Sequence, residues 1–385
     1  MMTCNLLFTG DIMAQIAQND ACRTPDGYDY SPVLAPVREL LKAGDMTVGN
    51  LETPFAGEPA GYSFARYSFN TPEEMAVQIK DDGFDLVSLA NNHCMDRNLA
   101  GLHHTLEVLD RIGLKHTGLA RTRLERDTPC IVERCGMRFG FLSYTYGTNA
   151  FAHRMFLPES ARYAVNLMQP EETLPGAIDL LDRKAVPHRV KELYETQNPL
   201  YEARIKPRLE QVQSDILRLR DEKADAVVML LHCGGQHDPE PDAYTREVVK
   251  RIVSMGVDAV ICNHQHILHP FSYVDGVPVA WCLGNLIQTP AQNVYPGLGP
   301  SYSAILRLCV EKTQRLYIRG VYARLTRCIE DERGRTIVYP LDRLIRESRG
   351  EDRAALISAR KHYVNLLRGL PADSPVEETD EYRIG

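Results

Sequence analysis

Short apolar runs rich in β-branched residues recur along this chain, and each ends abruptly in a group of polar side chains. Runs of this length, bounded by turn residues, fit buried strands better than helices. The polar groups that end them contain the Asp, Glu, Asn and His residues that metal ions use. The six runs cover residues 5–11, 46–52, 85–93, 226–232, 259–266 and 279–285.

Segments with a helical period of apolar residues separate these runs. In residues 99–112 leucines recur at helical spacing, and Gly113 ends the pattern. Residues 72–82 and 244–254 show the same pattern, and a glycine follows each within two residues. Alternating strands and helices predict an α/β fold, and such folds place ligands beyond the carboxyl ends of their strands. The polar groups are therefore expected to converge on one edge.

Two parts of the chain depart from this alternation. Residues 147–222 are charged, contain several prolines and end in a helical pattern, so we interpret them as a helix-rich insertion or cap over the strand ends. Residues 303–339 predict β-hairpins. Residues 354–368 predict a helix, and an acidic tail or strap follows it. The predicted organisation is one large domain over residues 1–345, then a C-terminal helix and acidic tail over residues 346–385.

Composition narrows the classes of function. The chain has 385 residues, of which 44% are hydrophobic and 25% charged, as is ordinary for a globular protein with one large domain or two. Its net charge is −7 and no cluster of Lys and Arg stands out, which argues against a nucleic-acid partner.

Targeting signals are also not apparent. No apolar run approaches the roughly 20 residues that span a bilayer, and the first residues lack the pattern of a signal peptide. The ten cysteines are scattered without a CxxC pair, as expected of buried free thiols in a reducing compartment. We therefore expect a cytoplasmic protein without a membrane span. The sequence leaves its oligomeric state open.

The polar groups together supply a set of metal ligands. Imidazoles mixed with carboxylates suit Zn²⁺, Mn²⁺ or Fe²⁺, whereas Ca²⁺ takes oxygens throughout. Two such ions usually share a bridging carboxylate and generate a hydroxide at neutral pH. The positive charge of two divalent ions exceeds the negative charge of two carboxylates and a hydroxide. The site is therefore expected to attract an anionic substrate, either a small molecule or a polymer. The candidate residues are Asp11, Glu52, Asn92, His93, His232, His264 and His266.

Each candidate also has a purely structural interpretation. Asp11 and Asn92 can cap helices, and Glu52 can lie in a surface loop. His93 can be a half-buried histidine with a satisfied hydrogen bond. The paired His264-x-His266 at a strand end is the strongest two-residue signal against these interpretations.

The order of these groups resembles that of the calcineurin-like metallophosphoesterases, whose blocks run Asp-x-His, Gly-Asp, Gly-Asn-His, a lone His and Gly-His-x-His. The chain is more similar still to the bacterial CapA family, which is linked to capsule and poly-γ-glutamate synthesis. This resemblance covers roughly residues 3–290 without much of the insertion. The blocks that carry it are Gly10-Asp-Ile-Met13, Asn50-Leu-Glu52, Leu89-Ala-Asn-Asn-His93 with Asp96, Gly101-Leu102, Thr105-Leu106, His232-Cys-Gly234, Gly256-Val-Asp258, His264-x-His266 and Leu283-Gly-Asn285.

The resemblance implies a four-layer αββα sandwich with a dinuclear site for divalent ions. His93 would stay off the metals and act as general acid or as a donor to the transition state, and Asp96 would orient it. By analogy the metal ligands are Asp11 and His266 for one ion, Asn92, His232 and His264 for the second, and Glu52 as the bridge.

Some positions depart from the family patterns. Met13 stands where the phosphoesterases have a histidine, as is usual in the CapA family, so one ion loses an imidazole. Cys233 and Gln236 replace the usual aromatic residue and glutamate, and Asn263 and Asn98 replace glycines. These changes affect the substrate assignment more than the fold.

Three functions follow from this reading. The first is a metal-dependent hydrolase that acts on a phosphoester, or on a γ-glutamyl amide, through a metal-bound hydroxide. The second is a non-catalytic binding or assembly protein in capsule or poly-γ-glutamate synthesis with a vestigial metal site. The third is a protein-interaction scaffold. Substitution of His93 discriminates among them, because a hydrolase would lose turnover and keep its metal.

Overall fold

The computed structural model describes residues 2–63, 68–153, 155–169, 199–292 and 296–385, and these form two packed β-sheets with helices on their outer faces. The larger sheet has nine strands in the order β16-β15-β14-β1-β4-β5-β6, with β13 paired to β1 and β17 to β15. Its strands are β1 (Met2–Ile12), β4 (Met46–Leu51), β5 (Leu86–Ser88), β6 (Lys115–Thr117), β13 (Asn285–Ile287), β14 (Tyr302–Lys312), β15 (Leu316–Glu330), β16 (Thr336–Pro340) and β17 (Tyr382–Arg383).

The smaller sheet has six strands in the order β11-β12-β10-β9-β8-β7, and β2 and β3 form a separate ribbon. Parallel pairing of β8, β9, β10 and β12 aligns their carboxyl ends, as it does for β1, β4, β5 and β6 in the larger sheet. The strands are β7 (Cys130–Arg134), β8 (Met137–Thr145), β9 (Ala226–His232), β10 (Ala259–Asn263), β11 (Phe271–Val274), β12 (Val277–Ala280), β2 (Arg23–Thr24) and β3 (Gly27–Tyr28).

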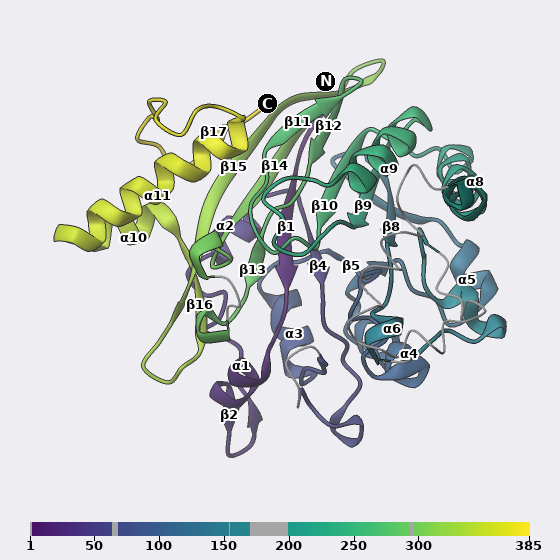
Figure 1. Cartoon of the computed structure of the whole chain (residues 1–385), viewed down its shortest axis with the longest axis horizontal. Coiled ribbons are helices and arrows are strands. Elements are labelled where there is room, and N and C mark those ends of the chain that lie inside the picture. The colour runs from purple at the N-terminus through teal and green to yellow at the C-terminus, as the bar shows by residue number, and fades with distance from the viewer. Residues whose placement is uncertain (1, 64–67, 154, 170–198, 293–295) are drawn as a thin grey trace.

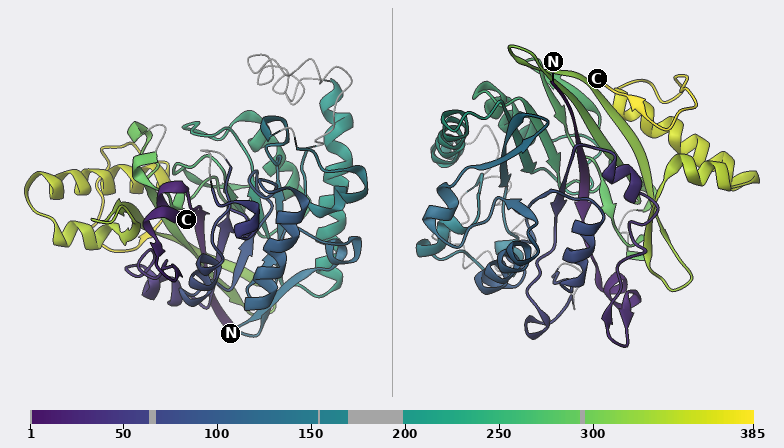
Figure 2. Two further views of the ribbon diagram at one scale, coloured as in Figure 1. Left: turned by 90° about the horizontal axis from the view of Figure 1, so that it is seen from below. Right: turned by 180° about the vertical axis from the view of Figure 1, so that it is seen from behind.

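Helices cover the outer faces of both sheets. Figures 1 and 2 show α8 and α9 on one side of the molecule. Helices α10 and α11 lie on the opposite side, where their apolar residues pack on the inner face of the larger sheet and not on an outer face. The helices are α1 (Ile16–Ala21), α2 (Arg38–Lys42), α3 (Glu74–Asp81), α4 (Asn98–Ile112), α5 (Arg123–Asp127), α6 (Ala150–His153), α8 (Pro199–Asp221), α9 (Ala243–Ser254), α10 (Leu341–Glu347) and α11 (Gly350–Arg368), with short 3-10 turns η1 (Glu58–Ala60), η2 (Glu159–Ala164), η4 (Pro290–Gln292) and η5 (Pro296–Leu298).

Three apolar clusters show why these layers hold together. The central cluster joins Phe8 and Val48 of the larger sheet to Phe141 and Val228 of the smaller one. A second cluster lies between the larger sheet and helices α2, α3 and α4. The third lies between the smaller sheet and helices α8 and α9. Because alternate residues of each strand point to opposite faces, each sheet is buried on both sides, and the predicted αββα sandwich is confirmed.

Most predicted elements are present, with two differences. The hairpin of β7 and β8 was not predicted, although β8 is a central strand of the smaller sheet. Within the predicted insertion, residues 154 and 170–198 lie outside the described residues. Its long helix α8 packs in the outer layer beside β8 and β9 and does not cover the strand ends, because its apolar stripe (Leu209, Val212, Ile216 and Leu219) faces that sheet.

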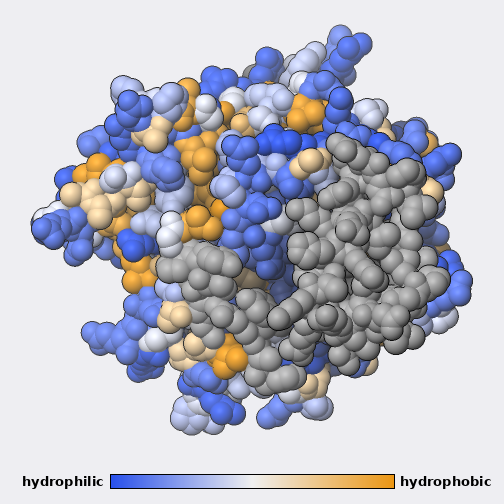
Figure 3. Space-filling view, in the orientation of Figure 1, coloured by the Kyte–Doolittle hydropathy of each residue, from blue (hydrophilic) through white to orange (hydrophobic). Residues whose placement is uncertain are grey.

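The C-terminal segment packs on the rest of the molecule. Leu356, Val364 and Leu367 of α11 join the central apolar cluster, and the acidic tail ends in β17, which pairs with β15. Figure 3 shows the face of the molecule seen in Figure 1. Its described surface is mostly hydrophilic, with apolar residues gathered toward the side that carries α10 and α11.

Candidate metal centre

The predicted ligands meet at the carboxyl ends of strands from both sheets. Asp11 lies in β1 and Glu52 directly follows β4, while His232 is the last residue of β9. Asn92 and His93 lie in the turn after β5, and His264 and His266 follow β10. All seven side chains are buried. The convergence expected from the strand pattern is therefore present in the structure.

Two groups of metal-competent side chains share Glu52. One contains Glu52, His232 and His264, and the other contains Asp11, Glu52 and His266, with one donor atom per residue and all atoms of a group within 4.8 Å of one another. Glu52 Oε1 lies 3.5 Å from His232 Nε2 and 3.8 Å from His266 Nε2. Glu52 therefore lies between two groups of side chains that could each hold a metal ion.

Asn92 directs its amide oxygen toward the first of these groups. Its Oδ1 lies 2.8 Å from His232 Nε2, which is 3.0 Å from His264 Nδ1. The Asn92 amide nitrogen donates to Asn149 Oδ1 at 3.2 Å, which fixes the orientation of the side chain. The Asn92 amide oxygen thus lies beside the two histidines, where it offers a fourth donor atom.

The chemistry of the buried groups fits divalent metal ions. Among the described residues, neither carboxylate oxygen of Glu52 receives a hydrogen bond from an N–H or O–H group. Burial, and then the charge of Asp11, raise the pKa of Glu52 well above its ordinary value. Burial lowers the pKa of His232 to about 3, and burial with neighbouring histidines holds the pKa of His264 well below its usual range. A buried carboxyl without a donor beside neutral imidazoles is costly unless a cation binds there.

Hydrogen bonds behind the ligands hold Asp11 and His266 in place. Asn50 donates from Nδ2 to Asp11 Oδ1 at 2.7 Å. His266 Nδ1 lies 3.1 Å from Asp11 Oδ2 and 2.9 Å from Asn285 Oδ1. Burial opposes ionisation of Asp11, but the hydrogen bond and charge of His266 hold its pKa below the ordinary value. The sequence analysis did not single out Asn50 as a site residue, although a buried polar residue inside an apolar run is a signal.

Unusual backbone conformations accompany the histidine pair. His264 has a φ of 117° and His266 a φ of 62°, in the region that favours glycine. At the neighbouring strand, a side chain at Gly10 would place its Cβ 2.0 Å from the carbonyl oxygen of Gly284. This close approach lets the Asp11 N–H donate to Gly284 O at 3.0 Å. Strain of this kind persists where surrounding structure fixes it, and it is concentrated at functional sites.

His93 lies beside the ligand groups without belonging to either of them. Its Nδ1 is 2.7 Å from Asp96 Oδ2, which also accepts the Phe69 N–H at 2.6 Å. The Phe69 ring stacks on His93 with ring centroids 4.2 Å apart. Because a carboxylate can only accept, the His93 proton is on Nδ1 and Nε2 is the free ring nitrogen. The predicted pairing of His93 with Asp96 is present in the geometry.

Three further aromatic residues that were not predicted as site residues line the centre. The Tyr146 ring lies 4.7 Å from the His264 ring, and the His237 ring lies 5.7 Å from the His266 ring, measured between centroids. His153 Nε2 approaches Asp96 Oδ1 at 3.5 Å. The first residues of the predicted insertion thus contribute to the site. Met13, at the position where the phosphoesterases have a histidine, is buried.

Comparison with known proteins agrees with these observations. Residues 5–290 match the family described as bacterial capsule synthesis protein PGA_cap, so the chain belongs to this family. The predicted resemblance to the CapA family is thereby confirmed.

Individual relatives are distant. The uncharacterized protein y4sH of Sinorhizobium fredii is 26% identical over 291 residues, which cover 66% of this chain and 61% of that protein. The capsule biosynthesis protein CapA of Bacillus anthracis is 25% identical over 68% of this chain and 54% of its own length. The PGA biosynthesis protein CapA of Bacillus subtilis is 21% identical over 65% of this chain and 55% of its own length. The chain thus spans little more than half the length of these relatives.

Solved structures are more distant still. The calcineurin-like phosphoesterase YfkN from Bacillus subtilis is 14% identical with a TM-score of 0.46, and the match covers 93% of this chain and 96% of that chain. The fold described above rests on the sheets and helices of this chain itself. Among the described residues, none of the helices is both long and apolar enough to cross a membrane.

Proposed function

We propose that this protein is a metal-dependent hydrolase that acts on an anionic substrate. The observation that carries the proposal is Glu52, a buried carboxyl without a hydrogen-bond donor among the described residues, shared by two groups of metal ligands. Asp11 and His266 would hold one divalent ion, and Asn92, His232 and His264 the other. When bound, Mn²⁺, Fe²⁺ or Zn²⁺ ions polarise an anionic group and lower the pKa of a water molecule.

The protein's own residues would orient the substrate's leaving group and supply a proton. Asp96 fixes the ring of His93 through Nδ1, and the stacked Phe69 ring limits its rotation. The protonated ring then donates from Nε2 to the leaving-group oxygen, or nitrogen in an amide. A positioned acid of this kind typically contributes about 10²–10⁴-fold to the rate. The centre's charge favours a phosphoester, or a γ-glutamyl amide with its carboxylate.

A non-catalytic binding or assembly function is the second candidate. It is favoured by the names of two relatives, which describe capsule and PGA biosynthesis, and by the absence of an imidazole at Met13. In that case the metal ions would hold the fold or bind a polyanion such as poly-γ-glutamate. His93 would then have no role in turnover.

A paired measurement of metal content and turnover tests the proposal. The full chain, purified without chelator, would be analysed for Mn, Fe and Zn by mass spectrometry, and assayed with bis(p-nitrophenyl) phosphate and γ-glutamyl-p-nitroanilide. We expect about two ions per chain at this centre in the parent protein, and a lower content in His264→Ala. His93→Gln should keep the ions and lose about 10²–10⁴-fold in kcat. His362→Gln, on the exposed face of α11, is the matched control.

The outcomes separate the two candidates. Equal turnover in the parent protein and His93→Gln would refute the assigned role of His93. Bound metal with no turnover on either probe would favour the binding or assembly function. A parent protein that binds no metal after incubation with Mn²⁺ would contradict both the hydrolase and the ligand assignment.

A further inference from the structure

A second cluster of metal-competent side chains lies at the opposite end of the strands. Cys4 is near the start of β1, Asp45 directly precedes β4, and Cys135 is in the turn between β7 and β8. Seven residues separate Cys4 from Asp11 along β1, which is about 23 Å of extended strand. The cluster is therefore separate from the histidine centre, and Cys4 precedes the part of the chain that matches the family.

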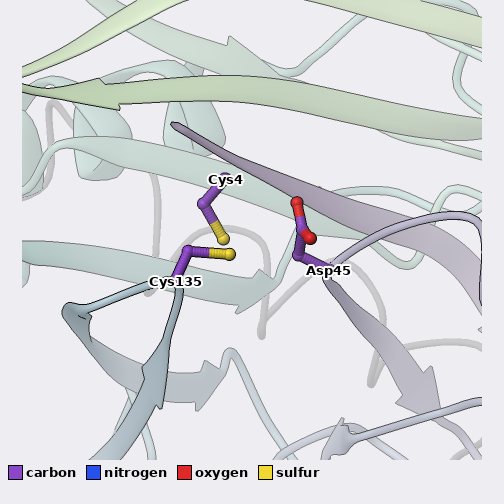
Figure 4. Close-up of side chains that lie close together, drawn as sticks. All are labelled: Cys4, Asp45 and Cys135. Atoms are coloured by element: carbon purple, nitrogen blue, oxygen red, sulfur yellow. The ribbon is translucent and has the colours of Figure 1, made fainter. Parts of the chain in front are cut away.

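The geometry brings the three side chains together. One donor atom from each residue lies within 4.8 Å of the other two. In Figure 4 the thiols of Cys4 and Cys135 point toward one another, and the Asp45 carboxylate lies beside them. Cys4 is fully buried, whereas Cys135 is exposed, so the cluster is open to solvent on one side.

Local structure orients the two more exposed ligands. Cys135 and Gly136 have φ angles of 51° and 73°, and they form the two-residue turn that directs the Cys135 side chain back toward β1. Asp45 is fixed by Asn5, whose backbone N–H donates to Asp45 Oδ2 at 2.7 Å. Strand β1 thus carries Cys4 and holds Asp45, while the β7–β8 turn positions Cys135.

We propose that Cys4, Cys135 and Asp45 bind a thiophilic divalent cation, Zn²⁺ in the first instance, with solvent at the fourth position. Two thiolates and a carboxylate are zinc ligands, and three protein ligands with one open position is a familiar zinc geometry. Asp45 favours a metal site over the alternative of a disulfide, because a disulfide has no use for a carboxylate, whereas a cation gains a third donor atom from it. The negative charge of the carboxylate also attracts a cation.

The raised pKa of Cys4 indicates that its thiol would lose its proton only when a metal ion binds. Burial first, and then the neighbouring thiol and Asp45, raise this pKa well above the ordinary value, so the thiol is neutral without metal. Metal binding would release the thiol protons. The bound ion would link β1 of the larger sheet to the β7–β8 hairpin of the smaller one, at the edge farthest from the histidine centre.

Cadmium titration of the reduced full chain tests the proposal, because cadmium–thiolate bonds absorb in the ultraviolet and histidine sites do not. We expect the parent protein to develop this absorption with about one equivalent bound to thiolate, a ratio typical of a single tetrahedral site. Cys135→Ser should abolish it, and Zn²⁺ should compete for the same site. His264→Ala should keep the absorption, which separates this cluster from the histidine centre.

The matched control is Cys130→Ser, at the other end of β7, which should behave like the parent protein. Cys135 is exposed, so its substitution should leave the fold intact. No thiolate absorption in the reduced parent protein, or absorption unchanged in Cys135→Ser, would overturn the proposal. A Cys4–Cys135 disulfide in protein purified without reductant, combined with no cadmium absorption after reduction, would overturn it in favour of a redox pair.

Discussion

The pairing of His93 with Asp96 yields the first prediction at the scale of single residues. In Asp96→Asn, the amide can present its NH₂ group to His93 Nδ1, which then cannot carry a proton. The ring is held in the neutral tautomer, and the imidazolium that would donate from Nε2 is disfavoured. We expect kcat to fall on the order of 10²-fold while the metal content is unchanged. The pH profile of kcat/KM should change shape, which a purely structural role of Asp96 would not cause.

Stability must be measured on the same variant, because Asp96 Oδ2 also accepts the Phe69 N–H. The new NH₂ group cannot accept that hydrogen bond, at a cost of about 1–3 kcal/mol. Urea unfolding of both proteins separates this loss from the catalytic one. An Asp96→Asn variant with parental kcat would show that His93 does not depend on this carboxylate.

Gly10 is the second residue for which geometry gives a definite expectation. A Cβ at this position would lie 2.0 Å from Gly284 O and 2.7 Å from Gly284 C, so two backbones must separate. Gly10→Ala should therefore reduce the free energy of unfolding by about 3 kcal/mol, the upper end of overpacking effects, and weaken metal retention through Asp11. Gly297→Ala is the control, since its Cβ would meet nothing within 4 Å. Denaturant unfolding of both variants checks the prediction, and equal stabilities would contradict it.

At the scale of secondary structure elements, the sequence predicted those whose pattern is long and regular. Helix α4 is capped at its C-terminus by Gly113, and α9 by Met255, just before Gly256. Both lie within one residue of the predicted ranges, and β9 has the predicted bounds. The hairpin of β7 and β8 was missed because Arg134 and Arg138 interrupt its apolar residues near the turn. Helix α8 was predicted, but its position was not, because a periodic pattern shows which face is buried and not against which sheet it packs.

The C-terminal strap, residues 371–385, gives a prediction that depends on pH. Arg307 donates from Nε and Nη2 to the Glu381 carboxylate at 3.0 and 2.5 Å. The neighbouring Tyr382 is buried and pairs with Ala323 of β15. Burial opposes ionisation of Glu381, but these hydrogen bonds and the charge of Arg307 hold its pKa below the ordinary value. The unfolded strap therefore binds the proton more readily than the docked one. The stabilisation is complete above the ordinary glutamate pKa and is lost as the pH falls through the lower, native pKa.

Glu381→Gln should accordingly lower the free energy of opening the strap by about 1 kcal/mol at pH 7. At acid pH the variant and the parent protein should open equally easily. Amide hydrogen exchange of residues 376–385, after correction for the intrinsic effect of pH, measures both. Other acidic residues of the strap titrate as well, so the comparison is between the two proteins at each pH. A difference that persists unchanged at pH 3 would contradict the role given to Glu381.

At the scale of the whole molecule, the sequence predicted the candidate ligands of the site but only some of the residues that surround them. The ligands were identified because each ends an apolar run, and parallel strands bring such ends together. Asn149 was not identified, because its contact with Asn92 depends on how the two sheets face each other. That relation is fixed by packing of side chains from distant parts of the chain, which periodicity does not report.

This convergence gives the last prediction, because the candidate metal ligands come from both sheets. Asp11 and Glu52 belong to the larger sheet, while His232, His264 and His266 belong to the smaller one. Bound ions would thus join the two layers at that edge, where they already meet through polar contacts such as that of His266 Nδ1 with Asp11 Oδ2. A ligand at a hundredfold excess over its Kd stabilises the native state by about 2.7 kcal/mol, which raises the Tm of a chain of this size by roughly 3 °C.

Removal of metal by a chelator should therefore lower the Tm by that amount or more, and Mn²⁺ or Zn²⁺ should restore it. His264→Ala should show a smaller response, since it loses one imidazole of the centre. Cys135→Ser is the control that keeps the histidine centre intact, so any chelator effect that disappears in it arises at the cysteine cluster instead. Scanning calorimetry at two metal concentrations makes the test quantitative, because a linkage effect grows with the logarithm of free metal. A Tm independent of metal in protein shown to bind it would mean that the folded and unfolded chains bind the ions equally, which is incompatible with a centre assembled only when the two sheets pack.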